Sequence, residues 1–200
     1  MKSAQIIAAA GLLLASTVHA TASSVYSGSG FGTYYYDVVE TDECGDNFEV
    51  ANTGQVECSL TQVWTLNDVN SDYLVAMNHS LLVGDMSEYC GKKVIVSVNG
   101  VASDLPLFIG DGCERCSEGS ATSATWDPYG APGLDFSYTV ANELNSLACD
   151  DGHIEITWEV VDELIYQFDT TGSGEPQGFV STSSSSAVAQ ATAAPKRFHA

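Results

Sequence analysis

Residues 93–101 read Lys-Val-Ile-Val-Ser-Val-Asn-Gly-Val, and this stretch decides the class of fold. Its first six residues have the length and β-branched composition of a buried strand. Asn99-Gly100 then places the residue pair that favours a tight hairpin turn between two apolar runs. We therefore expect a strand on each side of a tight turn at this point of the chain.

Further runs of strand length lie on both sides of this hairpin. They cover residues 31–39, 73–77, 107–109, 153–158 and 164–168. One helix is predicted over residues 138–147, where Ser137 can cap the first turn and the apolar residues Val140, Ala141, Leu144 and Leu147 recur at helical spacing. Many strands with one short late helix favour a mainly β, closed barrel over a sheet of alternating strands and helices.

The two ends of the chain differ from its middle. Residues 1–20 have the pattern of an export signal, with Lys2 ahead of an apolar run, 6–15, that is too short to span a bilayer. Residues 171–200 are rich in Ser, Thr and Ala and cannot bury a core, so we expect a disordered tail. The remaining residues, 21–170, suit one domain of a secreted, extracellular protein.

The cysteine count agrees with export. The six are Cys44, Cys58, Cys90, Cys113, Cys116 and Cys149. An oxidising compartment allows all six to pair, and the 15 possible pairings stay open at this point. Cys113 and Cys116, with Cys149 and His153, also have the spacing of a zinc site or a redox dithiol. A structural disulfide is the expected use in an exported chain, so no metal and no cofactor are predicted.

The chain is strongly acidic, with 26 Asp and Glu against 6 Lys and Arg and a formal net charge of −20. Between residues 21 and 170 the basic residues are Lys92, Lys93 and Arg115. Such a surface repels nucleic acid and anionic membranes, because binding to both depends on Lys and Arg. The predicted partners are therefore a neutral cell-wall polysaccharide or an extracellular protein with a basic surface.

Several short segments occur in an order that is typical of one family. They are Gly32-Thr33-Tyr34-Tyr35, Cys44-Gly45, Val75-Ala76-Met77-Asn78, Cys90-Gly91-Lys92-Lys93-Val94, Asn99-Gly100, Asp111-Gly112-Cys113-Glu114-Arg115-Cys116, Leu134-Asp135-Phe136-Ser137 and Gly152-His153-Ile154-Glu155-Ile156-Thr157-Trp158. Together they resemble the fungal secreted rare-lipoprotein-A-like proteins of the double-psi β-barrel superfamily, which includes expansins, barwin-type proteins and small endoglucanases. The resemblance implies a six-stranded double-psi β-barrel with one or two short helices, one open groove and a Cys44–Cys90 disulfide.

The same resemblance implies two candidate catalytic carboxyls. Asp135 matches the groove aspartate that looks like the proton donor of the endoglucanases, and Asp37 matches the position of their base. Inverting hydrolysis needs two carboxyl groups about 6.5–9.5 Å apart. Expansins lack a full pair and do not hydrolyse glycans. From the residues alone, Asp135 can equally be a helix-start carboxylate and Asp37 a solvated carboxylate at a strand end.

The groove is expected to be lined by Tyr34, Tyr35, Asn78, Asp111, Trp126 and Tyr129. Exposed aromatic rings would stack on sugar rings, although each aromatic residue can instead belong to the core, and Trp126 can instead pack its loop onto the barrel. Trp126 and Tyr129 lie in an insertion, residues 117–134, by which the chain departs from the family pattern. Asn78-His79-Ser80 is an N-glycosylation sequon, so a glycan on Asn78 is predicted.

The expected function is non-hydrolytic, expansin-like binding of a cell-wall or other extracellular glycan. One alternative is an inverting glycanase or lytic enzyme that uses Asp37 and Asp135. The other is a protein-binding module, of the effector or inhibitor type, whose acidic face contacts a basic partner. Two carboxyls facing each other across a groove would favour the enzyme, and the lack of an aromatic groove would favour the protein-binding module.

Overall fold

The computed structural model describes residues 22–59, 62–117, 125–168 and 178–180. The predicted export signal and most of the predicted tail lie outside these ranges. Within them, none of the helices combines the length and the apolar character that a bilayer span requires.

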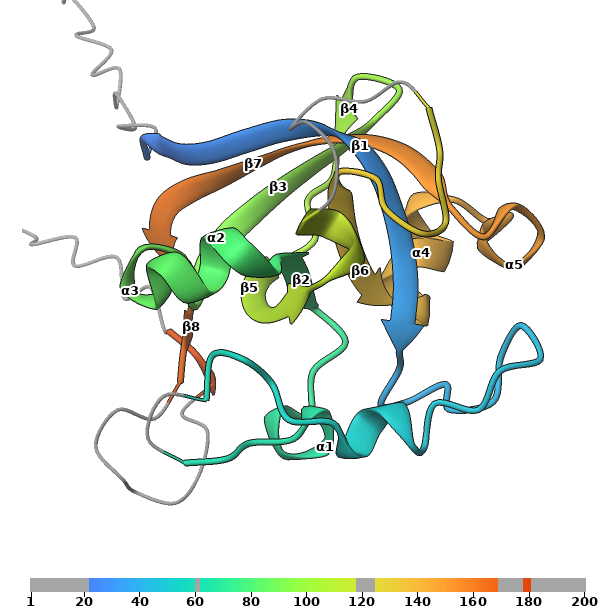
Figure 1. Cartoon of the computed structure of the whole chain (residues 1–200), viewed down its shortest axis with the longest axis horizontal. Coiled ribbons are helices and arrows are strands. Elements are labelled where there is room, and N and C mark those ends of the chain that lie inside the picture. The colour runs from blue at the N-terminus through green and yellow to red at the C-terminus, as the bar shows by residue number, and fades with distance from the viewer. Residues whose placement is uncertain (1–21, 60–61, 118–124, 169–177, 181–200) are drawn as a thin grey trace, which may run out of the picture.

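Seven strands form one mixed sheet, which confirms the expected mainly β fold. The strands are β1 (Ser24–Tyr36), β2 (Leu74–Asn78), β3 (Lys92–Val98), β4 (Val101–Ala102), β5 (Leu107–Cys113), β6 (Gly133–Ser137) and β7 (Ile154–Leu164). Their order is β4-β3-β5-β2-β6-β1-β7, and a further pairing of β3 with β7 closes six of them into a ring (Figure 1). β4 lies outside the ring and pairs antiparallel with the end of β3.

The ring combines two kinds of strand pair. β1 runs parallel to β6 and β2 runs parallel to β5, whereas the other pairs of the ring are antiparallel. β7 shows why the ring has a packed interior, because its residues alternate between buried and exposed from Ile154 to Trp158. Buried apolar side chains of the strands, Phe108 and Phe136 among them, meet inside the ring as one hydrophobic core.

The predicted hairpin is confirmed. Asn99 and Gly100 join β3 to β4 with φ angles of 51° and 79°. Two successive positive φ angles are the geometry that an Asn-Gly pair favours, since Gly carries no Cβ and Asn tolerates the left-handed region.

The predicted helix is confirmed as α4 (Tyr138–Leu144), and the Ser137 hydroxyl accepts a hydrogen bond from the Val140 amide at 3.1 Å. The helix ends three residues before the predicted end, because Asn145 has extended backbone angles. Four further short helices were not predicted: α1 (Leu66–Val69), α2 (His79–Gly84), α3 (Met86–Tyr89) and α5 (Ala148–Asp151). Segments of four to six residues are too short to show helical periodicity.

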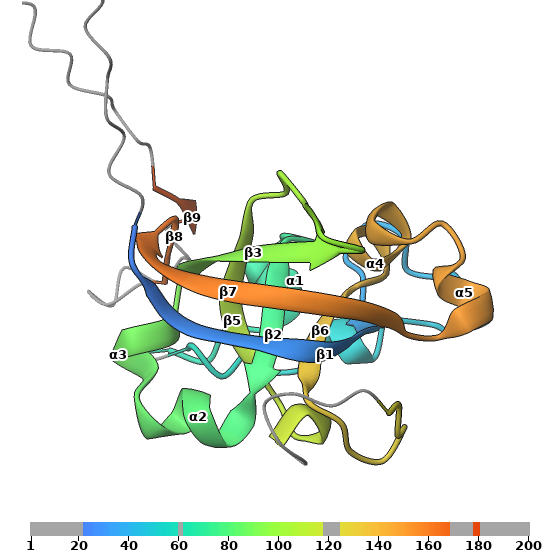
Figure 2. The same cartoon turned by 90° about the horizontal axis from the view of Figure 1, so that it is seen from above.

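A small second sheet closes the chain onto the barrel. β8 (Tyr166–Gln167) pairs with β9 (Gly178–Phe179), and the Val180 amide donates to the Ile165 carbonyl at 2.8 Å (Figure 2). Residues 178–180 therefore belong to the folded body, although the sequence placed them in the tail. The Phe179 ring is the reason, since its centroid lies 5.4 Å from that of Phe108 and 5.5 Å from that of Tyr166.

All six cysteines are bonded, as Cys44–Cys149, Cys58–Cys90 and Cys113–Cys116. The expected Cys44–Cys90 disulfide is wrong. The backbone beside Cys90 and that of Cys58 are both tied to β5, since the Gly91 amide donates to the Ile109 carbonyl and the Cys58 amide to the Gly110 carbonyl. These bonds bring Cys58 to Cys90. Cys44, in the loop after β1, instead reaches Cys149 in α5.

The corrected pairing gives a first testable prediction. Peptide mapping without reduction should recover a Cys44–Cys149 peptide, and a Cys44–Cys90 peptide would contradict the structure. Because this disulfide joins residues 105 positions apart, Cys44→Ala combined with Cys149→Ala should lower the free energy of unfolding by about 2–5 kcal/mol. Urea denaturation of the double variant and the wild type measures the loss.

Candidate functional site

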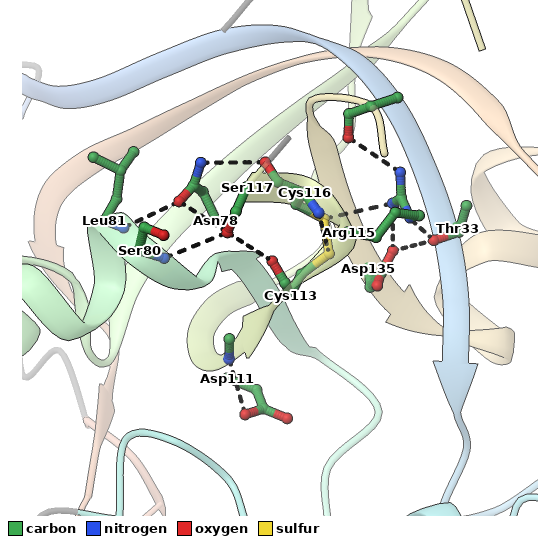
Figure 3. The surroundings of a disulfide bond; sticks show 12 residues. Thr33, Asn78, Ser80, Leu81, Asp111, Cys113, Arg115, Cys116, Ser117 and Asp135 are labelled. Atoms are coloured by element: carbon green, nitrogen blue, oxygen red, sulfur yellow. Dashed lines mark hydrogen bonds and ion pairs between the residues drawn. A yellow bond between two sulfur atoms is a disulfide. The ribbon is translucent and has the colours of Figure 1, made fainter. Parts of the chain in front are cut away.

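Asp135 lies in β6, opposite Thr33 of the parallel strand β1. Its carboxylate accepts a hydrogen bond from the Thr33 hydroxyl and forms an ion pair with Arg115, whose Nη2 lies 2.7 Å from Oδ1 (Figure 3). The Arg115 guanidinium also donates to the Thr33 hydroxyl at 3.1 Å and to the Ala131 carbonyl at 3.2 Å. The expectation of a helix-start carboxylate at Asp135 is wrong, because its side chain binds Arg115 and Thr33 instead.

Asp37, and not Asp135, is the carboxylate that binds the start of helix α4. Its Oδ2 accepts a hydrogen bond from the Thr139 amide in the first turn of α4 at 2.7 Å. Its Oδ1 accepts from the amides of Val39 at 3.0 Å and Glu40 at 2.6 Å. The residue is completely buried, so the expectation of a solvated strand-end carboxylate is wrong. Since a buried carboxylate needs such donors, Asp37 fixes the turn after β1 against α4.

Both members of the predicted catalytic pair have structural partners, and their catalytic role stays a prediction. Asp135 is neutralised by a half-buried Arg115, and Asp37 uses both oxygens to hold backbone amides. General acid–base catalysis requires a carboxyl that can exchange a proton with substrate within hydrogen-bonding distance. Arg115 was missed as the partner of Asp135 because 20 residues separate the two in the chain.

The other predicted groove residues have separate partners. The Tyr35 hydroxyl donates to Asp111 Oδ2 at 2.9 Å, while Asp111 Oδ1 accepts from the amides of Glu57 and Gly112. Burial raises the pKa of Asp111, and these hydrogen bonds oppose the rise. Tyr34 packs edge-on against Phe48 and Tyr138. These contacts tie the tyrosines to their neighbours, although both remain partly exposed.

Asn78 caps the first turn of α2. Its Oδ1 accepts from the Leu81 amide at 3.0 Å and from the Ser117 hydroxyl at 3.3 Å, and its Nδ2 donates to the Cys116 carbonyl at 3.2 Å (Figure 3). The side chain therefore joins α2 to the segment around the Cys113–Cys116 disulfide. Glycosylation of Asn78 stays a prediction.

Trp126 packs against the barrel. Its indole stacks on the His153 imidazole, with ring centroids 4.4 Å apart and planes 4° apart, and meets Phe31 edge-on at 5.4 Å. The Arg115 guanidinium lies 5.3 Å from the indole centroid. These contacts attach the inserted segment to the barrel. Tyr129 in the same segment is 91% exposed, and a role of the two residues in sugar stacking stays a prediction.

The Cys113–Cys116 disulfide borders the ion pair of Asp135. The two sulfur atoms and one Asp135 oxygen lie within 4.8 Å of one another, which is the spacing of a metal-binding cluster. Both sulfurs are used in the disulfide and Asp135 is paired with Arg115, so these residues do not fit a metal ion. The Cys116 amide donates to Cys113 Sγ at 3.0 Å, which holds this turn closed.

The sequence did not indicate a second pair of neighbouring carboxyl groups, Asp37 and Asp72. Asp72 lies near Asp37, and Asp72 Oδ1 accepts a hydrogen bond from the Val38 amide at 2.9 Å. Burial raises the pKa of Asp72 from 3.8 to about 6, the Asp37 carboxylate adds to the rise, and the Val38 amide opposes it. The sequence carries no signal for this pair, because Asp37 and Asp72 belong to segments that meet only in the fold.

The loop after β1 and the helical segment after β6 form one surface, which we call the acidic lobe (residues 37–53 and 138–152). The Cys44–Cys149 disulfide joins its two parts. Its solvent-facing carboxylates are Glu40, Asp42, Glu43, Asp46, Glu49, Glu143, Asp150 and Asp151. The lobe contains no Lys, Arg or His.

The Lys and Arg side chains of the described residues do not form ion pairs with the carboxylates of the lobe. Lys92 pairs with Asp162, Lys93 Nζ lies 3.4 Å from Glu163 Oε2, and Arg115 pairs with Asp135. None of these partners belongs to the lobe. The lobe therefore presents uncompensated negative charge to solvent, and like-charge repulsion acts between the two segments that the disulfide joins.

Comparison with known proteins gives a distant likeness in structure. No family model matches the chain, and no curated protein sequence matches it. A solved structure, described as "Streptomyces papain inhibitor (SPI)", aligns with a TM-score of 0.38 at 21% sequence identity, over 70% of this chain and 99% of that chain. A similarity this weak carries no argument about the ligand or partner of this chain.

The raised pKa of Asp72 gives a second testable prediction. Because the folded state binds this proton more tightly than the unfolded state, the stabilisation is complete below about pH 4 and is lost as the pH rises through 6. The shift corresponds to about 3 kcal/mol at most, which solvent screening at a half-buried carboxyl reduces to about 1–2 kcal/mol. Asp72→Asn, whose side-chain oxygen can still accept from the Val38 amide, should therefore be more stable than wild type at pH 7 by about that amount, and equal at pH 4.

Urea denaturation of both proteins between pH 4 and pH 7 measures the difference. Asp104→Asn changes an exposed carboxyl outside this pair and should track the wild type throughout. Asp37→Asn should instead be destabilised by about 1–3 kcal/mol, because one of its two buried acceptor oxygens is replaced by an NH2 donor that faces backbone amides. A constant offset between Asp72→Asn and wild type across the range would refute the assigned pKa.

Proposed function

We propose that this chain is a secreted protein-binding module that holds a basic partner protein on the acidic lobe. The observation that carries the proposal is the Cys44–Cys149 disulfide, which holds two acidic segments together as one surface without a basic side chain. Keeping like charges together opposes folding, and such local conflicts are typical of functional surfaces.

The composition of the lobe suits a protein partner. Between the carboxylates, the lobe exposes the aliphatic side chains of Val50 at 81%, Val39 at 70% and Leu147 at 53%. Apolar contacts surrounded by charge are typical of protein interfaces, and the carboxylates would steer a basic partner during association. A neutral glycan gains little from negative charge, and these aliphatic side chains offer it no ring to stack on.

The lobe is also held in one conformation. The buried Asp37 carboxylate accepts hydrogen bonds from the backbone amides of Val39 and Glu40. The side-chain Nδ2 of Asn52 donates to the backbone carbonyl of Asp37 at 2.7 Å. A surface that is ordered before binding loses less conformational entropy when the partner arrives. This order supports specific recognition over diffuse attraction.

We extend the proposal to the fold family and to export. The parallel pairs β1–β6 and β2–β5 within a ring of six strands support a double-psi barrel. Three disulfides support an oxidising, extracellular location. Asp37 accepts hydrogen bonds from backbone amides and Asp135 is paired with Arg115, which supports a binding function over hydrolysis.

Glycan binding is the second candidate, and one observation favours it. Ser29, Thr157 and Ser97 lie in register across β1, β7 and β3, which run side by side in Figure 2. They line a shallow hollow of about 540 Å³, with Glu159 at one end. A row of hydroxyl groups can hydrogen-bond to a neutral sugar chain, although this hollow has no aromatic ring exposed for stacking.

The third prediction tests whether a basic protein binds to the lobe specifically or is attracted by the net charge of the whole chain. The lobe variant Glu40→Gln/Asp42→Asn/Glu43→Gln should bind an immobilised basic protein, such as cytochrome c, about tenfold more weakly than wild type, because each interfacial charge speeds association. The control variant Glu88→Gln/Asp104→Asn/Glu155→Gln removes the same charge from exposed positions outside the lobe and should change binding less than about twofold. Surface plasmon resonance at two salt concentrations measures both.

Two outcomes would contradict the protein-binding function. Equal losses in the lobe and control variants would mean that net charge alone attracts basic proteins. Retention on cellulose, glucan or chitin, with no retention on basic proteins, would support the glycan-binding candidate instead.

A further inference from the structure

A cavity of about 550 Å³ opens beside the acidic lobe. It lies between the segment that follows α1, the start of α4 and the small β8–β9 sheet. Its lining includes Asp68, Asp72, Tyr73, Thr139, Tyr166 and Phe179. This volume is that of a typical ligand pocket and exceeds the need of one long side chain.

Aromatic rings form one side of the cavity. The Phe179 ring meets Tyr73 edge-on at 6.4 Å and Tyr166 at 5.5 Å between centroids. Phe179 is 46% exposed, whereas Tyr166 is buried against Phe108 with stacked rings 4.0 Å apart. Packing against this cluster holds Phe179 in place while its surface stays accessible. The electron-rich faces of aromatic rings attract cations and the methylene groups next to them.

Carboxylates supply the remaining chemistry. Hydrogen bonds from Thr65 lower the pKa of Asp68, so this exposed side chain is negative at neutral pH. Asp72 is half-buried and is held by the Val38 amide. Among the described residues, no Lys, Arg or His lines the cavity, and Lys92, Lys93 and Arg115 are paired elsewhere. The cavity thus combines negative charge with aromatic surface and has no cation of its own.

We infer that this cavity binds a lysine or arginine side chain of the basic partner, with its methylene groups on Phe179 and its charged end toward Asp72 and Asp68. The inference rests on the proposed function, since it names the part of that partner which is recognised. A carboxylate or phosphate would be repelled here, and a neutral side chain would gain only the aromatic contact. A long cationic side chain gains both.

The position of the cavity supports this occupant. Thr139, which lines it, is itself a residue of the lobe, and Asp72 in the lining is joined to the lobe through the hydrogen bond from the Val38 amide. A partner that lies on the lobe would therefore have the cavity at the edge of its footprint. Association guided by the lobe would bring a basic side chain to the opening.

The fourth prediction uses small probes in place of a partner. N-acetyl-lysine methylamide and N-acetyl-arginine methylamide, titrated into the ¹⁵N-labelled whole protein at pH 7, should shift the amides of Tyr73, Thr139 and Phe179 with saturation in the millimolar range. N-acetyl-norleucine methylamide, the uncharged analogue of lysine, should cause no saturable shift. Phe179→Leu should weaken lysine binding about threefold or more, because a cation–π contact is lost. Asp72→Asn, which keeps the fold, should weaken it further, and Glu88→Gln, at an exposed position outside the lobe and the cavity lining, should leave it unchanged.

Each outcome decides one question. Equal binding of norleucine, or cation-induced shifts spread evenly over the acidic surface, would overturn the cavity inference while the function of the lobe survives. Saturable lysine binding in the cavity, with no retention of basic proteins, would remove the proposed function and keep the cavity as a site for small cations. Saturable binding of lysine or arginine alone, lost in Asp72→Asn and kept in Glu88→Gln, supports the inference.

Discussion

The Asp37 carboxylate is the constraint on which the structure of the acidic lobe depends. It is completely buried and accepts three backbone amides, two from the turn that follows β1 and one from the first turn of α4. Replacing these bonds would leave a buried carboxylate without its donors, at a cost of about 1–3 kcal/mol. The loop of the acidic lobe and the α4 segment thus have a common anchor, to which the Cys44–Cys149 disulfide adds a second. Asp72, which lines the cavity, is joined to the same loop by the hydrogen bond that it accepts from the Val38 amide.

Local signals in the sequence were sufficient for much of the fold. Asn99-Gly100 predicted its own hairpin and Ser137 its own helix cap, because each depends on residues a few positions apart. The disulfides could not be predicted in this way. Cys58 meets Cys90 only because both flanking backbones bond to β5, and no local pattern reports that arrangement.

The candidate site was harder to predict for the same reason. The sequence singled out Asp37 and Asp135 by their positions, and both have structural partners that are distant in the chain. Arg115 neutralises Asp135 across 20 residues, and Thr139 binds Asp37 across 102. The acidic surplus, in contrast, was visible in the composition, but its concentration on one lobe depends on a disulfide between residues 105 positions apart.

The β9 strand affects how this protein can be shortened. A chain cut at residue 170, where the composition changes, would lose Phe179 from the cluster with Phe108 and Tyr166, as well as the partner strand of β8. The unpaired edge of β8 would then be open to strands of neighbouring molecules, and the uncovered rings would add apolar surface around it. Self-association of such a truncated protein would arise from the missing C-terminal residues, since β9 covers the edge of β8 in the longer chain.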